Sequence, residues 1–235
     1  MKAALVTGAS SGIGRSTAAT LAGRGYAVAV MARRAAGLAT VAREIGARGG
    51  RVLVIVGDVS VPADVERAVR ETAAAFGGIS VLVNNAGYAP LRTTAEFSVE
   101  EWRRIVDTNL SATFYGIRAV WPVMKAGGGG VIVNVSSMSA RDPFMGLGAY
   151  GAAKAGVNLL TLATAREGAA AGIRVHGVAP GAVDTPMLRG VLGDATVDPA
   201  AVLSPEAVAE MIAAMAEGAA RFTSGETVYV HAGPA

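Results

Sequence analysis

Seven short runs of apolar residues, many of them β-branched, recur along the chain, each separated from the next by at least a helix length. The runs are continuously apolar instead of alternating, as in strands of a parallel sheet that is buried on both faces. Strand and helix in alternation predict a doubly wound α/β fold, with helices on both faces of a mainly parallel seven-stranded sheet. The predicted strands are residues 3–8, 27–32, 51–58, 81–87, 131–137, 173–180 and 227–232.

Helix-length segments fill the intervals between these runs. Ser60 is a candidate cap for a helix that has Pro62 in its first turn, and Ser98 with Glu101 forms a capping-box pattern. No linker, repeat or low-complexity tail interrupts the pattern, so we expect one domain, residues 1–235. The predicted helices are residues 12–24, 35–48, 62–75, 98–125, 150–170 and 205–217.

Composition argues against several classes of protein. The net charge is only +3 and the basic residues are scattered, so nothing supports nucleic-acid binding. No apolar run approaches the roughly 18 residues of a membrane span. The first predicted strand begins at Ala3, with no room for a targeting peptide, and cysteine is absent; we therefore expect a cytoplasmic protein. The two histidines, His176 and His231, are not clustered, so no metal site is predicted.

A glycine-rich loop, VTGASSGIGRS, joins the first predicted strand to the first helix. Gly8, Gly12 and Gly14 have the spacing GxxxGxG, which departs from the standard GxGxxG but allows the same tight turn and close backbone approach to a pyrophosphate. The spacing predicts a dinucleotide-binding, Rossmann-type fold. The other loop residues expected at the cofactor are Ser10, Ser11 and Ile13.

The second predicted strand ends in MARRAAG, where the NAD pattern has an acidic residue. Arg33 and Arg34 stand there instead. A guanidinium suits a 2′-phosphate, which a carboxylate would repel, so we predict that NADP(H) is preferred, with Arg33 as the main contact. The alternative is that both arginines are merely solvated at the start of a helix.

Tyr150 and Lys154 lie four residues apart in a predicted helix of small and apolar residues, GAYGAAKAGVNLL. Positions i and i+4 share one helix face, so the phenol and the ammonium would point the same way. Alone, the pair could be a half-buried tyrosine beside a lysine that extends to solvent.

Six motifs occur in order along the chain: the glycine loop, NNAG (84–87), Asn109, NVSS (134–137), YGAAK (150–154) and PGAVDTPM (180–187). Together they resemble the short-chain dehydrogenase/reductase family in its compact single-domain form. Each motif alone is weak, whereas all six in order are highly specific. The resemblance covers nearly the whole chain.

The resemblance implies roles for four catalytic residues. Tyr150 would be the general acid/base, and Lys154 would lower the tyrosine pKa and bind the nicotinamide ribose. Ser137, thirteen residues before Tyr150, would hydrogen-bond the substrate oxygen; any of Ser136, Ser137 and Ser139 could instead simply cap or bond backbone, and the spacing favours Ser137. Asn109 would hold a water chain that reprotonates the lysine, the alternative being an exposed position on a polar helix face.

The resemblance also implies further contacts to NADP(H). Asp58 and Val59 would meet the adenine, although Asp58 could equally be a turn residue at the end of a strand. Asn84 or Asn85 would also join neighbouring strands. The remaining cofactor residues are Asn85, Ala86 and Gly87 on the adenosine side, and Pro180, Gly181, Val183 and Thr185 around the nicotinamide, beside Tyr150 and Lys154.

A short lid at about residues 186–204 would leave the substrate pocket open. Arg141 could meet a carboxylate or be solvated. The predicted pocket is mostly apolar, which indicates a hydrophobic ketone, aldehyde or secondary alcohol. Its expected residues are Tyr88, Met138, Phe144, Met145, Leu147, Met187 and Leu188.

We therefore predict an NADPH-dependent carbonyl reductase. The alternatives are an NADP-dependent alcohol dehydrogenase working in the oxidative direction and a non-catalytic dinucleotide-binding sensor. Apolar residues in helices 98–125 and 150–170 exceed what one sheet face requires, which predicts a homodimer or homotetramer through these helices, unless both simply bury more against the sheet.

Overall fold

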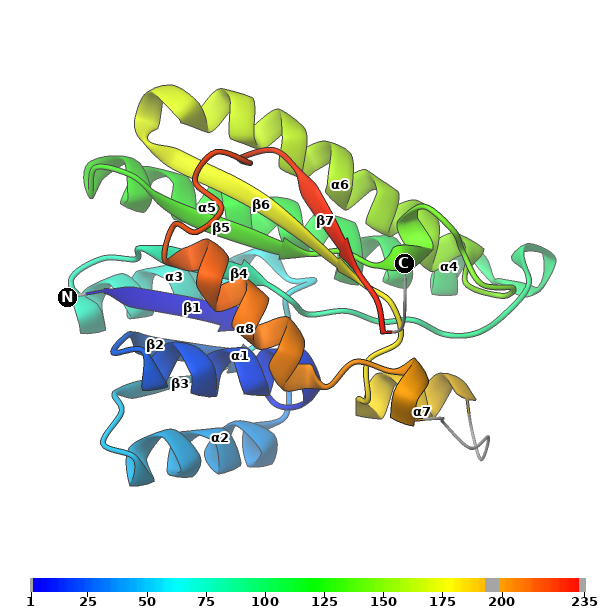
Figure 1. Ribbon diagram of the computed structural model, residues 1–235, viewed down its shortest axis with the longest axis horizontal. Helices are drawn as coiled ribbons and strands as arrows, with labels where there is room; N and C mark the ends of the chain where they lie inside the picture. The colour runs from blue at the N-terminus through cyan, green and yellow to red at the C-terminus, as the bar shows by residue number, and fades with distance from the viewer. Residues whose placement is uncertain (1, 193–198, 233–235) are drawn as a thin grey trace.

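A computed structural model describes residues 2–192 and 199–232. Its seven strands form one sheet in the order β3-β2-β1-β4-β5-β6-β7, and every neighbouring pair is parallel (Figure 1). The predicted doubly wound, Rossmann-type sheet is therefore confirmed. The strands are β1 (Ala3–Thr7), β2 (Ala27–Ala32), β3 (Val52–Val56), β4 (Val81–Asn84), β5 (Gly130–Val135), β6 (Ile173–Pro180) and β7 (Thr227–Val230).

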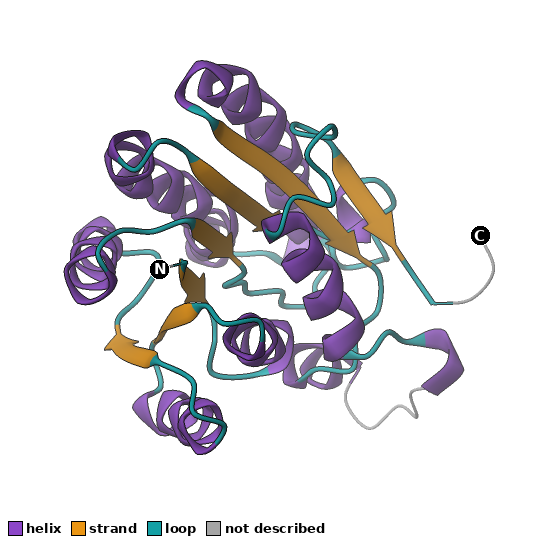
Figure 2. Ribbon diagram, turned by 60° about the vertical axis from the view of Figure 1, so that its left-hand side comes forward, coloured by secondary structure: helices purple, strands orange, loops and turns teal. Residues whose placement is uncertain are grey.

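Helices cover both faces of the sheet, giving the expected three layers (Figure 2). Helices α1, α2 and α8 pack on one face, and α3, α5 and α6 on the other. Within the described residues, no helix is long and apolar enough to cross a membrane. The helices are α1 (Gly12–Gly23), α2 (Ala35–Ala47), α3 (Pro62–Phe76), α4 (Val99–Val106), α5 (Ala112–Ala126), α6 (Gly148–Gly168), α7 (Pro186–Leu192) and α8 (Pro205–Ala216).

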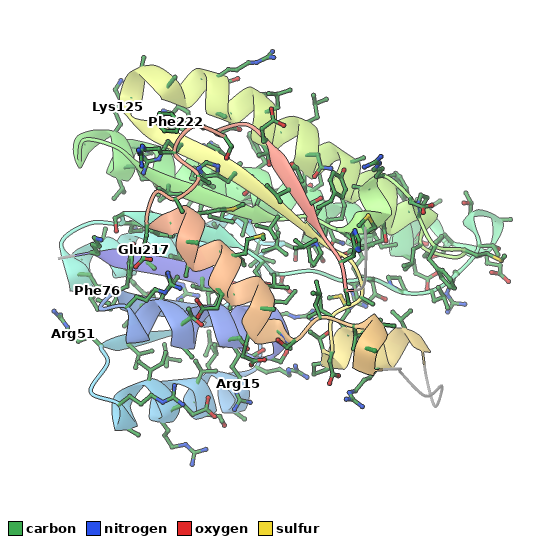
Figure 3. The ribbon with its side chains drawn as sticks, viewed as in Figure 1. Arg15, Arg51, Phe76, Lys125, Glu217 and Phe222 are labelled. Carbon is green, nitrogen blue, oxygen red and sulfur yellow. The ribbon has the colours of Figure 1, made fainter. Side chains whose placement is uncertain are left out.

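Successive side chains of the central strands enter opposite cores. Along β2, Val28 and Val30 pack toward α1 and α2, whereas Ala29 and Met31 pack toward α3. The amino ends of the strands carry surface contacts such as Arg51 beside Phe76, 5.4 Å from guanidinium to ring centre (Figure 3). The carboxyl ends lie at the opposite edge, toward α7 (Figure 1). Because β1 pairs with both β2 and β4, the strand order reverses there, which opens a crevice at that edge.

Two local predictions were wrong. The helix expected over 98–125 is divided into α4 and α5 by a π-helical segment, Asp107–Ser111. Asn109 accounts for the irregularity, because its side-chain amide donates to the carbonyl of Ile105 one turn earlier. Ser60 does not cap α3: Val61 holds the N-cap position, and the Ser60 hydroxyl donates to Asp58 Oδ1.

The capping box at α4 is confirmed. The backbone N–H of Glu101 donates to Ser98 Oγ, and the N–H of Ser98 donates to the Glu101 carboxylate, both at 3.1 Å. Helix α7 lies inside the segment that was expected to form a lid, and was not predicted as a helix.

A buried polar chain joins β4, β5 and α6. The amide of Asn84 donates to Asn134 Oδ1, and the amide of Asn134 donates to Thr161 Oγ1, both at 2.9 Å. The Thr161 hydroxyl in turn donates to the carbonyl of Val157 at 2.8 Å. A side chain at Gly116 would place its Cβ 2.3 Å from Asn84 Oδ1, so only glycine lets α5 approach this chain. These bonds hold α6 in register with the sheet.

Replacement of Thr161 by valine should lower the free energy of unfolding by about 1–3 kcal/mol, because it leaves the buried Asn134 amide without an acceptor. Equilibrium denaturation with urea measures the change. Thr17→Val is the matched control: Thr17 is fully buried, and within the described residues its Oγ1 has no hydrogen-bond partner. Equal losses in the two variants would show that the polar chain contributes nothing specific.

Candidate active site

A pocket of about 700 Å³ opens at the carboxyl ends of the strands. It is lined by the glycine loop after β1 and by residues that follow β2 to β6, together with the start of α6 and α7. The predicted cofactor residues that line it are Gly8, Ser10, Ser11, Gly12, Ile13, Arg33, Arg34, Asp58, Val59, Asn85, Ala86, Gly87, Tyr150, Lys154, Pro180, Gly181, Val183 and Thr185.

The glycine loop has the geometry of an anion cradle. Gly8 and Gly12 have φ values of +65° and +52°, which favour glycine. Ser11 is the N-cap of α1 without a side-chain hydrogen bond, and the first turn holds no acidic residue, so its backbone N–H groups are open to a phosphate. The loop residues therefore fit a dinucleotide pyrophosphate.

Gly14 is the one predicted loop residue that does not line the pocket. It is buried, and a Cβ there would lie 2.5 Å from the Gly8 carbonyl oxygen and 2.4 Å from Asn85 Nδ2. Its role is close packing of the first turn of α1 against the loop rather than contact with a ligand.

Arg33 and Arg34 follow the end of β2 and form one rim of the pocket. Arg33 Nη1 lies 3.8 Å from Asp58 Oδ2, and the guanidinium remains well exposed. Asp58 also accepts hydrogen bonds from the backbone and hydroxyl of Ser60. Asp58 is thus both a turn residue and a pocket residue, and it holds one arginine near the site expected for the adenosine ribose.

Asn84, the last residue of β4, and Asn85, which follows it, both join neighbouring strands. Asn84 belongs to the buried polar chain, while Asn85 Nδ2 donates to the carbonyl of Thr7 at 2.9 Å. The Thr7 hydroxyl accepts from the backbone N–H groups of Asn85 and Ala86. These contacts tie the loop after β4 to the end of β1, beneath the glycine loop.

Tyr150, Lys154 and Ser137 meet on the pocket floor. Lys154 is buried, and its Nζ donates to the carbonyl of Val135 at 2.7 Å and lies 5.6 Å from the Tyr150 ring centre. The hydroxyl of Ser137 hydrogen-bonds with Tyr150 and also accepts from the N–H of Ser139. Ser136 instead donates to the backbone carbonyl of Lys154. Of the three serines, Ser137 is thus the one whose hydroxyl contacts the Tyr150 hydroxyl.

Burial dominates the acid–base properties of this pair. It raises the pKa of Tyr150 to about 12, and the hydrogen bond with Ser137 opposes the rise. Burial also lowers the pKa of Lys154 to about 8. The expected lowering of the tyrosine pKa by Lys154 stays a prediction: in this structure desolvation is the largest influence on Tyr150, and the Lys154 ammonium donates to the Val135 carbonyl.

Asn109 neither lines the pocket nor lies on an exposed face. It is completely buried, its amide donates to the carbonyls of Ile105 and Tyr88, and its Oδ1 accepts from the N–H of Tyr88. The side chain therefore fixes the backbone of the segment that follows Gly87. Its predicted water chain to Lys154 stays a prediction.

Five of the seven residues predicted to contact the substrate line the pocket. Tyr88 and Met145 do not line it: the Tyr88 ring packs beneath the Arg104 guanidinium at 4.1 Å, and Met145 is 81% exposed. Arg141 lies over the Tyr229 ring, 5.8 Å from its centre, and not in the pocket. The residues confirmed as lining are Met138, Phe144, Leu147, Met187 and Leu188.

Several pocket residues escaped the sequence analysis. They follow β4, lie in the π segment, belong to the segments before α6 and α7, or lie in α7 itself, and their positions next to predicted residues were the only available signal. These residues include Ala89, Thr108, Ser139, Asp142, Ala182, Pro186 and Val191. The expected lid at 186–204 contains α7 and a 3₁₀ turn, Pro199–Ala201, and its part from 193 to 198 lies outside the described residues.

A doubly wound sheet with a glycine cradle at its switch point, and a tyrosine, serine and lysine on the pocket floor, defines a nucleotide-dependent oxidoreductase of the Rossmann type. The model of the family described as short chain dehydrogenase matches residues 2–195. The chain belongs to the short-chain dehydrogenase/reductase family, whose members use a nicotinamide cofactor.

Relatives with assigned activities match almost the whole chain. Cyclohexanol dehydrogenase of Acinetobacter sp. (strain SE19) is 38% identical, over 97% of this chain and 93% of the relative. Cis-4-hydroxycyclohexanecarboxylate dehydrogenase of Sinomonas cyclohexanicum is 41% identical, over 99% and 96%. Among solved structures, 3-ketoacyl-(acyl-carrier-protein) reductase of Brucella melitensis, complexed with NADH, has a TM-score of 0.90 and 34% identity, over 99% and 97% of the two chains.

The lowered pKa of Lys154 predicts how stability depends on pH. Below pH 8 the lysine is charged in both the folded and the unfolded chain, and the cost of burying the charge is fully present. Between pH 8 and its ordinary value of 10.5 the folded chain releases the proton first, so stability rises with pH. Relative to Lys154→Met, the wild type should gain about 2 kcal/mol of unfolding free energy between pH 7 and 9.5.

Urea denaturation of the two proteins without added cofactor, at a series of pH values, measures this difference. Tyr150 is present in both, so its titration above pH 10 cancels in the comparison. A difference that stays constant over this range would show that the folded-state pKa of Lys154 is not lowered.

Proposed function

We propose that the protein is an NADP(H)-dependent oxidoreductase that transfers hydride between the nicotinamide and a hydrophobic ketone, aldehyde or secondary alcohol. The observation that carries the proposal is the meeting of Tyr150, Ser137 and Lys154 in the same pocket as the glycine cradle and Arg33. All of these groups belong to residues 1–235, which we take to act as one domain.

The bound nicotinamide supplies or accepts the hydride, and the protein handles the proton. In reduction, Tyr150 donates its hydroxyl proton to the carbonyl oxygen as negative charge develops there, and Ser137 donates a hydrogen bond to the same oxygen. A tyrosine whose pKa is raised holds its proton at neutral pH, which suits the role of acid. Lys154, held by the Val135 carbonyl, stabilises the tyrosinate that remains, and in oxidation the same groups act in reverse.

Arg33 and Arg34 support the preference for NADP(H). Their guanidinium groups stand at the end of β2, where an acidic residue would bind the ribose 2′-hydroxyl of NAD. A 2′-phosphate placed there would be attracted by two guanidinium groups, although the nearby Asp58 carboxylate partly offsets the positive charge of Arg33. The related Brucella structure holds NADH, so the arginines rather than the family support this choice.

The apolar lining by Met138, Phe144, Leu147 and Met187 supports a hydrophobic substrate. Two relatives are named for alcohols on a cyclohexane ring, which makes cyclic ketones and secondary alcohols suitable first probes. The relative named as a cyclohexanol dehydrogenase also favours the second candidate, an NADP-dependent alcohol dehydrogenase working in the oxidative direction.

We also propose that two or four copies associate through the α4–α5 and α6 helices. Four large apolar side chains on these helices are exposed: Val99 by 58%, Trp102 by 45%, Phe114 by 48% and Leu159 by 69%. An isologous contact between these helices would bury them.

Tyr150→Phe should reduce kcat/KM for NADPH-dependent ketone reduction by roughly 10²- to 10⁴-fold, because the variant lacks the transferable proton. The assay follows NADPH absorbance with cyclohexanone and related ketones. Tyr26→Phe is the control, since Tyr26 is buried just before β2, at the opposite end of the sheet. If the wild type binds NADPH but catalyses neither reduction nor oxidation, the proposal of a non-catalytic dinucleotide-binding sensor is favoured instead.

Arg33→Ala should raise the dissociation constant of NADPH roughly 10- to 100-fold and that of NADH much less, because only NADPH carries the 2′-phosphate. Fluorescence titration of each reduced cofactor measures both constants. Arg43→Ala removes an arginine of α2 that does not line the pocket and serves as the control. Equal weakening of the two cofactors by Arg33→Ala would overturn the assignment.

A further inference from the structure

The charged residues of the pocket are divided between its two ends. Arg33, Arg34 and Asp58 gather where β2 and β3 end, on the side expected for the adenosine. Lys154 is buried in the floor. Among the described lining residues, the remaining charged side chain is Asp142. In the sequence it lies between Met138 and Phe144, two apolar lining residues at the end expected for the substrate.

Asp142 is held in place by the loop before α6. Its backbone N–H donates to the carbonyl of Met138 at 3.0 Å, which closes a turn. The residues around it pack against the first turns of α6: a Cβ at Gly151 would lie 2.4 Å from the Ser139 carbonyl oxygen and 3.2 Å from Pro143 Cβ. Because Gly151 directly follows Tyr150, this packing anchors the loop that carries Asp142 against the turn that carries the tyrosine.

The arginines of the neighbouring segments have other partners. Arg141 lies over the Tyr229 ring, and Arg92 is paired with Glu101 at 3.0 Å. On α7, Arg189 is paired with Asp184 at 2.7 Å. No ion pair engages Asp142 within the described part of the chain. Among the described lining residues, its carboxylate is therefore a negative charge without an ion-pair partner at this end of the pocket.

We propose that Asp142 selects against anionic substrates, so that the site takes uncharged hydrophobic ketones and alcohols and rejects those that carry a carboxylate. This inference rests on the proposed oxidoreductase function and assigns its substrate class. A substrate carboxylate in the pocket meets a like charge there, and because Asp142 is exposed to solvent, dissolved salt can screen the repulsion. An uncharged substrate of the same shape is not repelled.

The test compares two isosteric ketones, 4-oxocyclohexanecarboxamide and 4-oxocyclohexanecarboxylate, with NADPH as the reductant. The measured quantity is the ratio of kcat/KM for the amide to that for the carboxylate. Asp142→Asn keeps the side-chain shape and removes the charge, and should lower this ratio roughly tenfold at low salt. The difference between wild type and variant should shrink in about 0.5 M sodium chloride, because it is electrostatic.

Glu167→Gln is the matched control. It removes one carboxylate near the C-terminal end of α6, outside the pocket, and should leave the ratio unchanged. Asp142→Lys should lower the ratio further than Asp142→Asn. An unchanged ratio in both Asp142 variants, with the amide still reduced, would overturn the selectivity while the oxidoreductase function stands. Failure of the wild type to reduce or oxidise any carbonyl or alcohol probe would overturn both.

Discussion

Burial of the sheet on both faces is the constraint on which this structure depends. Because neither face of β1, β4 and β5 meets water, the strands pair in parallel and each connection must cross over through a helix. The carboxyl ends of all strands then emerge at one edge. Residues that are far apart in the chain, from Gly8 to Thr185, are brought into one pocket by that arrangement.

Within this frame, α6 is positioned by polar bonds rather than by apolar packing alone. The Asn84–Asn134–Thr161 chain connects its middle to β4 and β5. About two turns nearer the start of α6, the bond from Lys154 Nζ to the Val135 carbonyl connects the helix to the end of β5. Burying an ammonium group is costly, as its lowered pKa reflects. The hydrogen bond to the Val135 carbonyl offsets part of that cost, and it holds the cation beside Tyr150, where the proposed chemistry places negative charge.

Much of the fold and of the cofactor side could be predicted from the sequence, since both depend on local patterns. Apolar runs identify buried strands, and the glycine spacing together with Arg33 identifies the cradle and its rim. The errors arose where a side chain's role depends on a distant partner. Gly14 packs against the Gly8 carbonyl, and Tyr88 turns beneath Arg104, instead of lining the pocket. No local pattern reveals such contacts.

By itself, the sequence determined the order of strands and helices, the dinucleotide-binding class and the pairing of Tyr150 with Lys154, because hydrophobic periodicity, glycine conformation and helix geometry act over short distances. Only the tertiary structure decided the directions in which the pKa values of that pair shift, the burial of Asn109 in a π segment and the position of Asp142 in the pocket lining. Desolvation and long-range contacts arise only when separate elements pack together, so neither can be predicted from any one segment of the chain.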